Sequence, residues 1–330
     1  MNPTQTQRRR LLTAAIAAPA TFGLLSPWAH AQTWPSRAVS MIVGFPPGGI
    51  ADLTTRLVAN HLTRALGQPV TVDNRAGAAG NIGAQAVASS APDGYTLLSA
   101  PASLLAINPH LHRMTFDPFT DLVPVAATGR VFVYLMARAN LGVRNVQDFL
   151  TMLRARPGQL TFGSAGNGTS SHIAGEIFTS QANVTARHIP YRGAAPALTA
   201  LIGGEIDFLF DSGPGLQAAQ AGRAQLLAVG SRTRVPALPD LPTLHESGLT
   251  DFDVDTIFGI YARSGTPPAI VARLSSEIGR IMQSTEMREG LVAIGAGTAL
   301  EGSPQELAAR IRNDSERFGR IIRERNIRPD

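Results

Sequence analysis

The chain repeats one pattern: a short apolar segment, a loop of glycines and hydroxyl residues, and a segment with helical spacing. It first occurs as a strand predicted over residues 40–45, the loop "PPGG" and a helix predicted over 50–66, which Gly67 ends. It returns as a strand over 160–162 and a helix over 171–182. Such alternation with short links predicts mostly parallel sheets with helices on both faces, an α/β fold.

Two long apolar stretches predict that the chain passes between two domains. Residues 121–139 lead out of the first domain, and the stretch "DTIFGIYARSGTP" leads back. The predicted division is lobe I at residues 32–128 plus 257–330, completed by two C-terminal helices, and lobe II at 129–256.

The first 31 residues have the three parts of an export signal. The run Arg8-Arg9-Arg10 is the basic head, residues 11–25 are apolar, and Ala29-His30-Ala31 is an A-x-A cleavage site, so the mature chain is expected to begin at Gln32. The arginine run suits a twin-arginine signal or an ordinary secretory signal, and both routes stay open. No later segment is long and apolar enough to span a bilayer, and the chain has no cysteine that could carry a lipid, so we expect a soluble periplasmic protein without a lipid anchor.

Composition excludes several kinds of chemistry. The sequence has no cysteine and no lysine. It therefore offers no thiolate nucleophile, cysteine zinc site, Schiff base or Walker-type phosphate loop. No cofactor and no metal site are predicted; His110 and His112 are expected to form a surface pair.

Net charge gives no sign of a nucleic-acid partner. Removal of the three signal arginines lowers the formal charge from +5 to +2. The arginines near the C-terminus, from Arg310 to Arg328, alternate with Asp314, Glu316 and Glu324, which favours a solvated helix face.

Two loops are candidates for anion binding. In a parallel sheet, ligands bind where strands end and helices begin, and "FPPGGIAD" and "GSAGNGTSSH" occupy that position, one in each predicted lobe. Free backbone N–H groups at a helix start attract an anion. The alternative is an ordinary turn with a capped helix, with Ser170 or Ser171 as the cap. Neither loop matches G-x-G-x-x-G, which makes a dinucleotide site a weak interpretation.

A catalytic serine is the competing interpretation of the second loop. Ser164, His172 and Asp211 could assemble in space as a hydrolase triad. The glycine that would stand two residues before Ser164 in a nucleophile elbow is replaced by Phe162, which argues against that chemistry.

Several stretches together resemble the Bug family, the TctC-like periplasmic solute-binding proteins of tripartite tricarboxylate transporters. They include "IVGFPPGGIADLTTR", "VDNRAGAAGNIGAQAVASSAPDGYTLL", "FGSAGNGTSSHIAGEIF", "HIPYRGAAPAL" and "LPDLPTLHESG". The resemblance implies a two-lobed, type II Venus-flytrap fold that closes on a small organic carboxylate. Asp73 stands where glutamate is expected and Arg192 where lysine is usual; neither change should abolish binding.

The resemblance also implies the ligand-binding residues and the partners. The ligand-binding residues it implies are Phe45, Pro46, Gly48, Gly49, Asp52, Ala100, Pro101, Ser103, Ser164, Ala165, Gly168, Thr169, Ser170, His172, Tyr191, Arg192, Gly193 and Asp211. The expected function is capture of a di- or tricarboxylate, an acidic amino acid or a related acid by a monomer, without catalysis, for delivery to membrane permease subunits. The first alternative is a sensory adaptor that binds the same acid and docks on a membrane kinase. A serine-dependent hydrolase is the second and less favoured alternative.

Overall fold

The computed structural model describes residues 34–330 apart from 213–214, 295–296, 300–301, 325–326 and 329–330. The predicted export signal lies outside the described residues. The chain from Trp34 on forms one compact unit. Among the described residues, no helix has both the length and the apolar character needed to cross a membrane.

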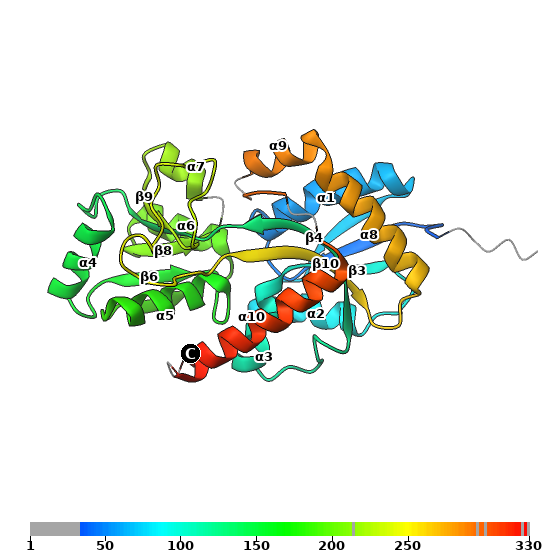
Figure 1. Ribbon diagram of the computed structural model, residues 1–330, viewed down its shortest axis with the longest axis horizontal. Coiled ribbons are helices and arrows are strands. Elements are labelled where there is room, and N and C mark those ends of the chain that lie inside the picture. Colours follow the sequence, from blue (N-terminus) through cyan, green and yellow to red (C-terminus); the bar gives the residue numbers. More distant parts are fainter. Residues whose placement is uncertain (1–33, 213–214, 295–296, 300–301, 325–326, 329–330) are drawn as a thin grey trace, which may run out of the picture. The chain divides into compact units, whose positions relative to one another are not determined.

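Two five-stranded sheets organise this unit (Figure 1). The strands of sheet A are, in spatial order, β2 (Val70–Asn74), β1 (Val39–Val43), β3 (Thr96–Pro101), β10 (Thr256–Arg263) and β4 (Leu122–Val131). Those of sheet B are β7 (Arg187–Pro190), β6 (Thr161–Ser164), β8 (Phe208–Asp211), β5 (Tyr134–Arg138) and β9 (Ala224–Val229). Both sheets are mixed, because two of the four strand pairings in each are parallel and two are antiparallel. Four of the five strands in each sheet nevertheless run in one direction, as the sequence predicts.

Each sheet contains one reversed strand, and that strand arrives from the other sheet. β10 returns from sheet B and pairs antiparallel with β3 and β4. β5 follows directly on β4 and pairs antiparallel with β8 and β9. The chain therefore crosses between the sheets twice, after Val131 and before Thr256. The predicted lobe boundaries, 128/129 and 256/257, fall within β4 and β10, and the division into two lobes stays a prediction.

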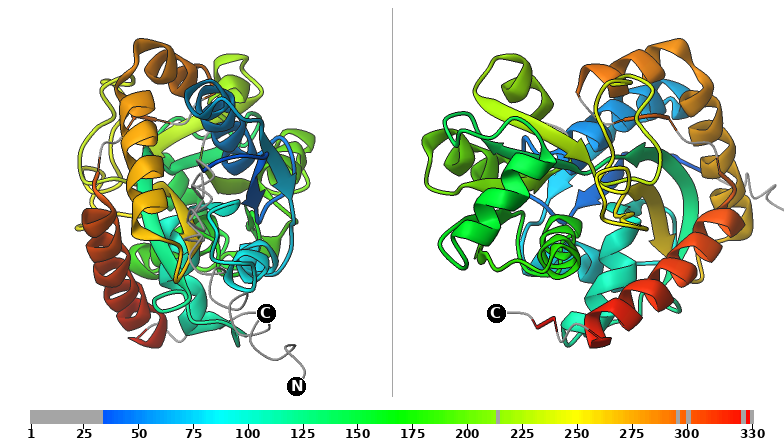
Figure 2. Two further views of the ribbon diagram at one scale, coloured as in Figure 1. Left: turned by 90° about the vertical axis from the view of Figure 1, so that its right-hand side faces the viewer. Right: turned by 60° about the vertical axis from the view of Figure 1, so that its left-hand side comes forward.

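Helices lie on both faces of the sheets, as Figure 2 shows. Those packed around sheet A are α1 (Ile50–Leu66), the short 3-10 turn η1 (Ala78–Gly80), α2 (Asn81–Ala88), α3 (Ala102–Leu111), α8 (Pro268–Gln283), α9 (Thr285–Ala293) and α10 (Pro304–Glu324). Those of sheet B are α4 (Val146–Ala155), α5 (Ser170–Ala182), α6 (Ala194–Gly203) and α7 (Gly215–Gln220).

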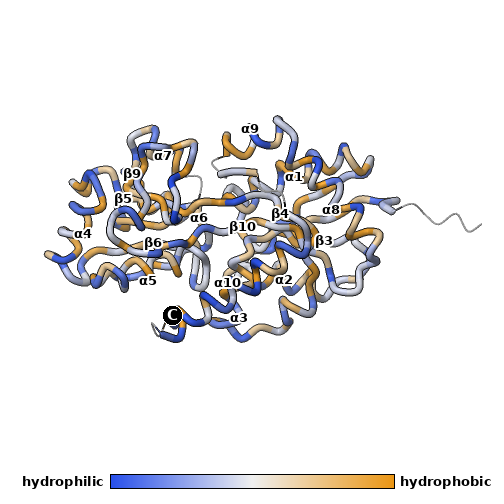
Figure 3. The backbone as a smooth tube through the Cα atoms, viewed as in Figure 1, coloured by the Kyte–Doolittle hydropathy of each residue, from blue (hydrophilic) through white to orange (hydrophobic). Residues whose placement is uncertain are grey.

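The core runs through both sheets. One cluster of buried side chains includes Leu98 in β3, Phe208 in β8 and Phe318 in α10. Hydrophobic residues follow the strands of both sheets, and hydrophilic ones are frequent along α10 (Figure 3). Gly67 ends α1 in the left-handed conformation with φ 68°, and its N–H donates to the Thr63 carbonyl, which confirms the predicted helix end.

Candidate ligand-binding site

A cavity of about 810 Å³, its open mouth included, lies where helices of both sheets begin. Its walls come from the starts of α1 and α3 at sheet A and of α5 and α6 at sheet B. The residues that line it are Phe45, Pro46, Pro47, Gly49, Ile50, Ala51, Ala79, Pro101, Ser103, Leu104, Ala165, Gly168, Thr169, Ser170, Ser171, Gly193, Ala194, Ala195, Pro196, Ala197, Leu209, Phe210, Asp211, Ser212, Thr256 and Phe258.

None of the four helices that begin at the cavity is capped by its own N-cap side chain. Their N-caps are Gly49, Pro101, Thr169 and Gly193, and none makes a side-chain capping bond. Elsewhere the chain does cap helices: the Asn145 side chain accepts from Asp148 N at α4, and Ser284 from Met287 N at α9. First-turn N–H groups at uncapped helix starts are available to an anion, and the helix dipoles favour negative charge there.

The loop before α1 is built around Asp52. Its carboxylate is 2% exposed and accepts hydrogen bonds from Gly48 N, Arg56 Nε and Asn74 Nδ2, each at 3.0 Å. Asn74 Nδ2 also donates to the Phe45 carbonyl at 3.0 Å. Asp52 is not among the cavity-lining residues. The carboxylate therefore fixes the shape of the loop that carries Phe45 and Gly49 to the cavity.

Replacing Asp52 by asparagine is expected to change how stability depends on pH. Burial alone would raise the pKa of Asp52, but the hydrogen bonds from Arg56, Gly48 and Asn74 outweigh it and hold the pKa below its usual value. Such a group stabilises the fold above its unfolded pKa of about 3.9 and loses that contribution as pH falls through the folded pKa. Urea unfolding should show a more stable wild type near neutral pH and a gap to Asp52→Asn that closes in acid. A gap that stays constant with pH would contradict this.

The loop before α5 uses most of its hydroxyls internally. The Ser171 Oγ accepts from Ala165 N at 2.9 Å, and the Thr169 Oγ1 donates to the Gly166 carbonyl at 2.7 Å. The Ser164 Oγ, on a residue that is 1% exposed, accepts from Gly166 N at 3.1 Å and lies 2.7 Å from His188 Nε2. These bonds hold the loop in shape.

Three lining serines, Ser103, Ser170 and Ser212, have hydroxyls that make no hydrogen bond to a described residue. Ser170 begins α5 and Ser103 lies in the first turn of α3, and no hydrogen bond within the described residues involves either Oγ. The Ser103 backbone N–H donates to Thr256 Oγ1 at 3.4 Å. Thr256 also lines the cavity, so one wall combines α3 with the returning strand β10.

Within the described residues, Asp211 supplies the only charged side chain of the lining. Its Oδ2 accepts from Gly215 N at 2.8 Å, and it pairs in register with Tyr134 of β5. Burial and the Asp211 charge raise the pKa of Tyr134, which keeps this phenol neutral. Negative charge on a ligand would therefore be balanced by backbone dipoles and hydroxyls.

Part of the predicted site lines the cavity and part lies behind it. Eleven of the predicted residues are among the lining: Phe45, Pro46, Gly49, Pro101, Ser103, Ala165, Gly168, Thr169, Ser170, Gly193 and Asp211. Those outside the lining are Gly48, Asp52, Ala100, Ser164, His172, Tyr191 and Arg192.

Several of the residues outside the lining support the backbone or belong to the core. His172 is 2% exposed, its Nδ1 accepts from Gly168 N at 3.1 Å, and its ring stacks on His188 with centroids 4.3 Å apart. The Tyr191 N–H donates to the Ser164 carbonyl at 3.0 Å. Arg192 is exposed. Fifteen lining residues were not among those predicted, Ala79, Thr256 and Phe258 among them; the last two belong to the stretch interpreted only as a passage between domains.

Family and structural comparisons agree with this geometry. The model of the tripartite tricarboxylate transporter family receptor matches residues 54–327. A protein encoded in the tcbD-tcbE intergenic region of a Pseudomonas species is 36% identical over 96% of this chain and 94% of its own length. Protein BugT of Bordetella pertussis is 35% identical over 95% of this chain and 94% of its own length.

Solved structures match closely. Rpa4515 of R. palustris, determined with adipate, has a TM-score of 0.87 and 33% identity and covers 90% of this chain and 100% of its own. The periplasmic binding protein BugD has a TM-score of 0.85 and 30% identity and covers 89% of this chain and 99% of its own. MatC of Rhodopseudomonas palustris, with bound malate, has a TM-score of 0.82 and 29% identity and covers 88% of this chain and 100% of its own.

The family consists of transport receptors, so the chain is not an enzyme and the hydrolase alternative is wrong. The sheets, the cavity and these matches together assign the chain to the tripartite tricarboxylate transporter receptor family, as a periplasmic binding protein of the Bug type.

Proposed function

We propose that this protein captures a small organic carboxylate in the cavity and delivers it to the membrane permease of a tripartite tricarboxylate transporter. The observation that carries the proposal is the convergence of four uncapped helix starts on one cavity whose described lining has no basic side chain. Relatives that bind adipate and malate support the ligand class, and the family match supports the transporter.

Binding exchanges water for fixed protein groups. The first-turn N–H groups that have no partner in the protein lose water and gain a carboxylate oxygen, a charge-assisted hydrogen bond. The Ser103 N–H is not one of them, because it donates to Thr256 Oγ1. The hydroxyls of Ser103 and Ser170 are the side-chain donors best placed to join them. Because the dipoles are fixed by the helices, little reorganisation is needed when the anion enters.

The lining also narrows the kind of carboxylate. Phe45, Leu104 and Phe258 are among the large apolar residues at the cavity, and Asp211 is the single charge of the described lining. A mono- or dicarboxylate with an apolar body suits these walls, because its methylene or ring surface leaves water on binding. A tricarboxylate would bring a third negative charge without a cation to meet it, and Asp211 would repel it.

A panel of acids tests the proposal by thermal unfolding of protein freed of bound ligand. Adipate, benzoate, malate, glutamate and citrate are compared, and we expect adipate or benzoate to raise the melting temperature most. At a hundred times the dissociation constant, mass action adds about 2.7 kcal/mol to the free energy of unfolding. That corresponds to a rise of roughly 4 °C for a mature chain of about 300 residues.

Two controls isolate the carboxylate. Adipamide has the chain length of adipate without its charge, and sodium chloride matches the ionic strength; neither should shift the melting temperature. Absence of a shift with every acid would overturn carboxylate capture, and a largest shift with citrate would overturn the narrower ligand class. For delivery, uptake of the bound acid by vesicles that contain the permease should require this protein.

A further inference from the structure

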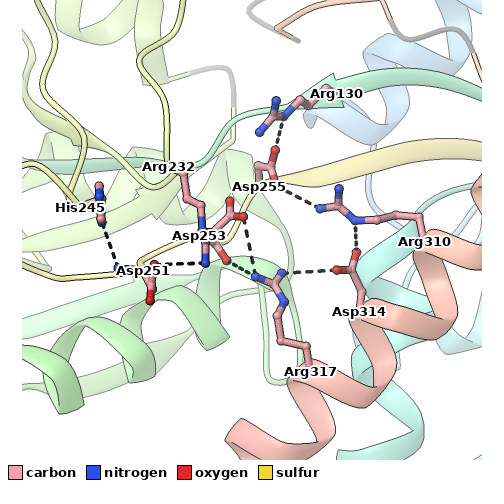
Figure 4. Close-up of polar contacts among 9 residues, drawn as sticks. All are labelled: Arg130, Arg232, His245, Asp251, Asp253, Asp255, Arg310, Asp314 and Arg317. Carbon is pink, nitrogen blue, oxygen red and sulfur yellow. Dashed lines mark hydrogen bonds and ion pairs between the residues drawn. The ribbon is translucent and has the colours of Figure 1, made fainter.

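A chain of ion pairs around the buried Asp255 carboxylate connects β4, the segment before β10 and α10 (Figure 4). At its centre, the Asp255 side chain is 1% exposed and contacts Arg130 Nε of β4 and, at 3.3 Å, Arg310 of α10. The chain continues from Arg310 Nε to Asp314 at 2.7 Å, and from Asp314 to Arg317 at 3.4 Å.

Arg317 closes the network on the segment that leads into β10. Its guanidinium donates to the Asp253 carbonyl oxygen at 2.8 Å and lies 3.9 Å from the Asp253 carboxylate. Burial and the neighbouring Asp255 charge raise the pKa of Asp253, whereas the arginines lower it. The sequence predicts a solvated face for α10, but Arg310 and Arg317 are only 35% and 30% exposed, because they neutralise these acids. Arg232 and Asp251 in the same figure form a separate, exposed pair.

The network holds the two segments that connect the sheets. Arg130 lies next to the end of β4, and Asp255 immediately precedes β10; the next residues of the two strands, Val131 and Thr256, pair with each other. Any change in the position of sheet B relative to sheet A must be taken up at these two segments. α10 packs against β4 and against α3, so it ties the connection to the helix that begins at the cavity.

The side chains of Asp255 and Thr256 point to opposite sides of one segment, Asp255 toward the arginines and Thr256 toward the cavity. Successive side chains of extended backbone point in opposite directions. Accordingly Asp255 contacts the arginines, while Thr256 lines the cavity and its Oγ1 accepts from Ser103 N at 3.4 Å. A displacement of Asp255 would therefore move Thr256 and the first turn of α3.

We infer that Asp255 is a positioning residue for ligand capture, which acts through Thr256 and Ser103 without touching the ligand. The inference rests on the proposed function, because it assumes that a carboxylate occupies the cavity. Binding of a panel acid to the wild type tests that function first, and the variants are compared only afterwards. The two can thus fail separately.

A double-mutant cycle at neutral pH tests the inference by calorimetric titration. The probe is adipate, or the panel acid with the largest thermal shift if adipate does not bind. Asp255→Asn and Thr256→Val are each expected to raise the dissociation constant about tenfold, a change of about 1.4 kcal/mol. If Asp255 acts through Thr256, the double variant should bind no more weakly than the weaker single variant.

Asp121→Asn is the matched control. Asp121 Oδ1 contacts the Arg263 guanidinium at 2.9 Å, at the opposite end of the same two strands, and the side chains are 33% and 30% exposed. This variant should change the dissociation constant less than about twofold, as expected for an accessible pair. Equal effects of Asp121→Asn and Asp255→Asn, or additive effects within the cycle, would overturn the inference.

A second variant keeps the test decisive if Asp255→Asn does not fold. Asp314→Asn weakens the hold on Arg310 and Arg317 while the Asp255 carboxylate stays in place. We expect it to weaken binding about threefold, a smaller effect than removal of the central carboxylate, because Asp314 acts one step further from Thr256. An affinity equal to that of Asp121→Asn would count against the network.

Discussion

Gly193→Ala is expected to weaken ligand binding about a hundredfold, which corresponds to about 2.7 kcal/mol. Gly193 is the N-cap of α6, with φ 120° and ψ 169°, a region that residues with a Cβ rarely adopt. A Cβ built there would lie 3.1 Å from Pro46 Cδ, and both residues line the cavity. The methyl group would strain the start of α6 and push it away from the loop before α1.

Gly204→Ala provides the control at the other end of the same helix. Gly204 also has a positive φ, 79°, but no atom lies within 4 Å of the position that a Cβ would take there. Alanine at this residue should cost about 1 kcal/mol of stability through its left-handed backbone and leave affinity unchanged. Titration calorimetry with adipate compares the two. Wild-type affinity in Gly193→Ala would show that the start of α6 does not contribute to the site.

Gly44→Ala is expected to cause the largest loss of stability, about 3 kcal/mol, as overpacking of a tight contact does. A Cβ on Gly44 would lie 2.5 Å from the Gly80 carbonyl oxygen and 2.6 Å from its Cα. The obstacle is backbone, so no side-chain rotation relieves it. The end of β1 and the start of α2 would have to separate, and both adjoin cavity-lining residues, Phe45 and Ala79.

Gly279→Ala separates this steric effect from the intrinsic effect of alanine. Gly279 lies inside α8, and nothing is within 4 Å of a Cβ at that position. There the substitution should stabilise the protein by up to about 1 kcal/mol, because alanine favours helix. Denaturant unfolding measures both. If both variants gained stability, the close approach of Gly44 and Gly80 would be wrong.

Local patterns were sufficient to predict much of the fold. The apolar stripe of α1 and its terminal glycine identify that helix without reference to the rest of the chain. α3 escaped prediction because eight of its ten residues are buried, so it has no polar face to mark a helical period, and Pro109 lies inside it. The capped helix α4 was also missed, although Asn145 before an apolar repeat was a usable signal.

The candidate site was predictable as loops but not as individual side chains. The stretches before α1, α5 and α6 do meet at one cavity. Which hydroxyl faces it depends on bonds formed only in the folded loop: the Ser164 Oγ is 2.7 Å from His188, twenty-four residues away. Thr256 reaches the cavity because β10 returns between β3 and β4, a pairing that no local pattern encodes.

The reversed strands also impose an order on assembly. All five strands of sheet B lie in one stretch, residues 134–229, and can pair without any later part of the chain. Sheet A cannot be completed then, since β3 and β4 are joined only through β10, which is made after the whole of sheet B. Until residues 256–263 emerge, β3 and β4 remain open edges, and such edges are where nascent chains aggregate. Strand β10, which contributes Thr256 to the cavity, is thus also the last strand that sheet A needs for completion.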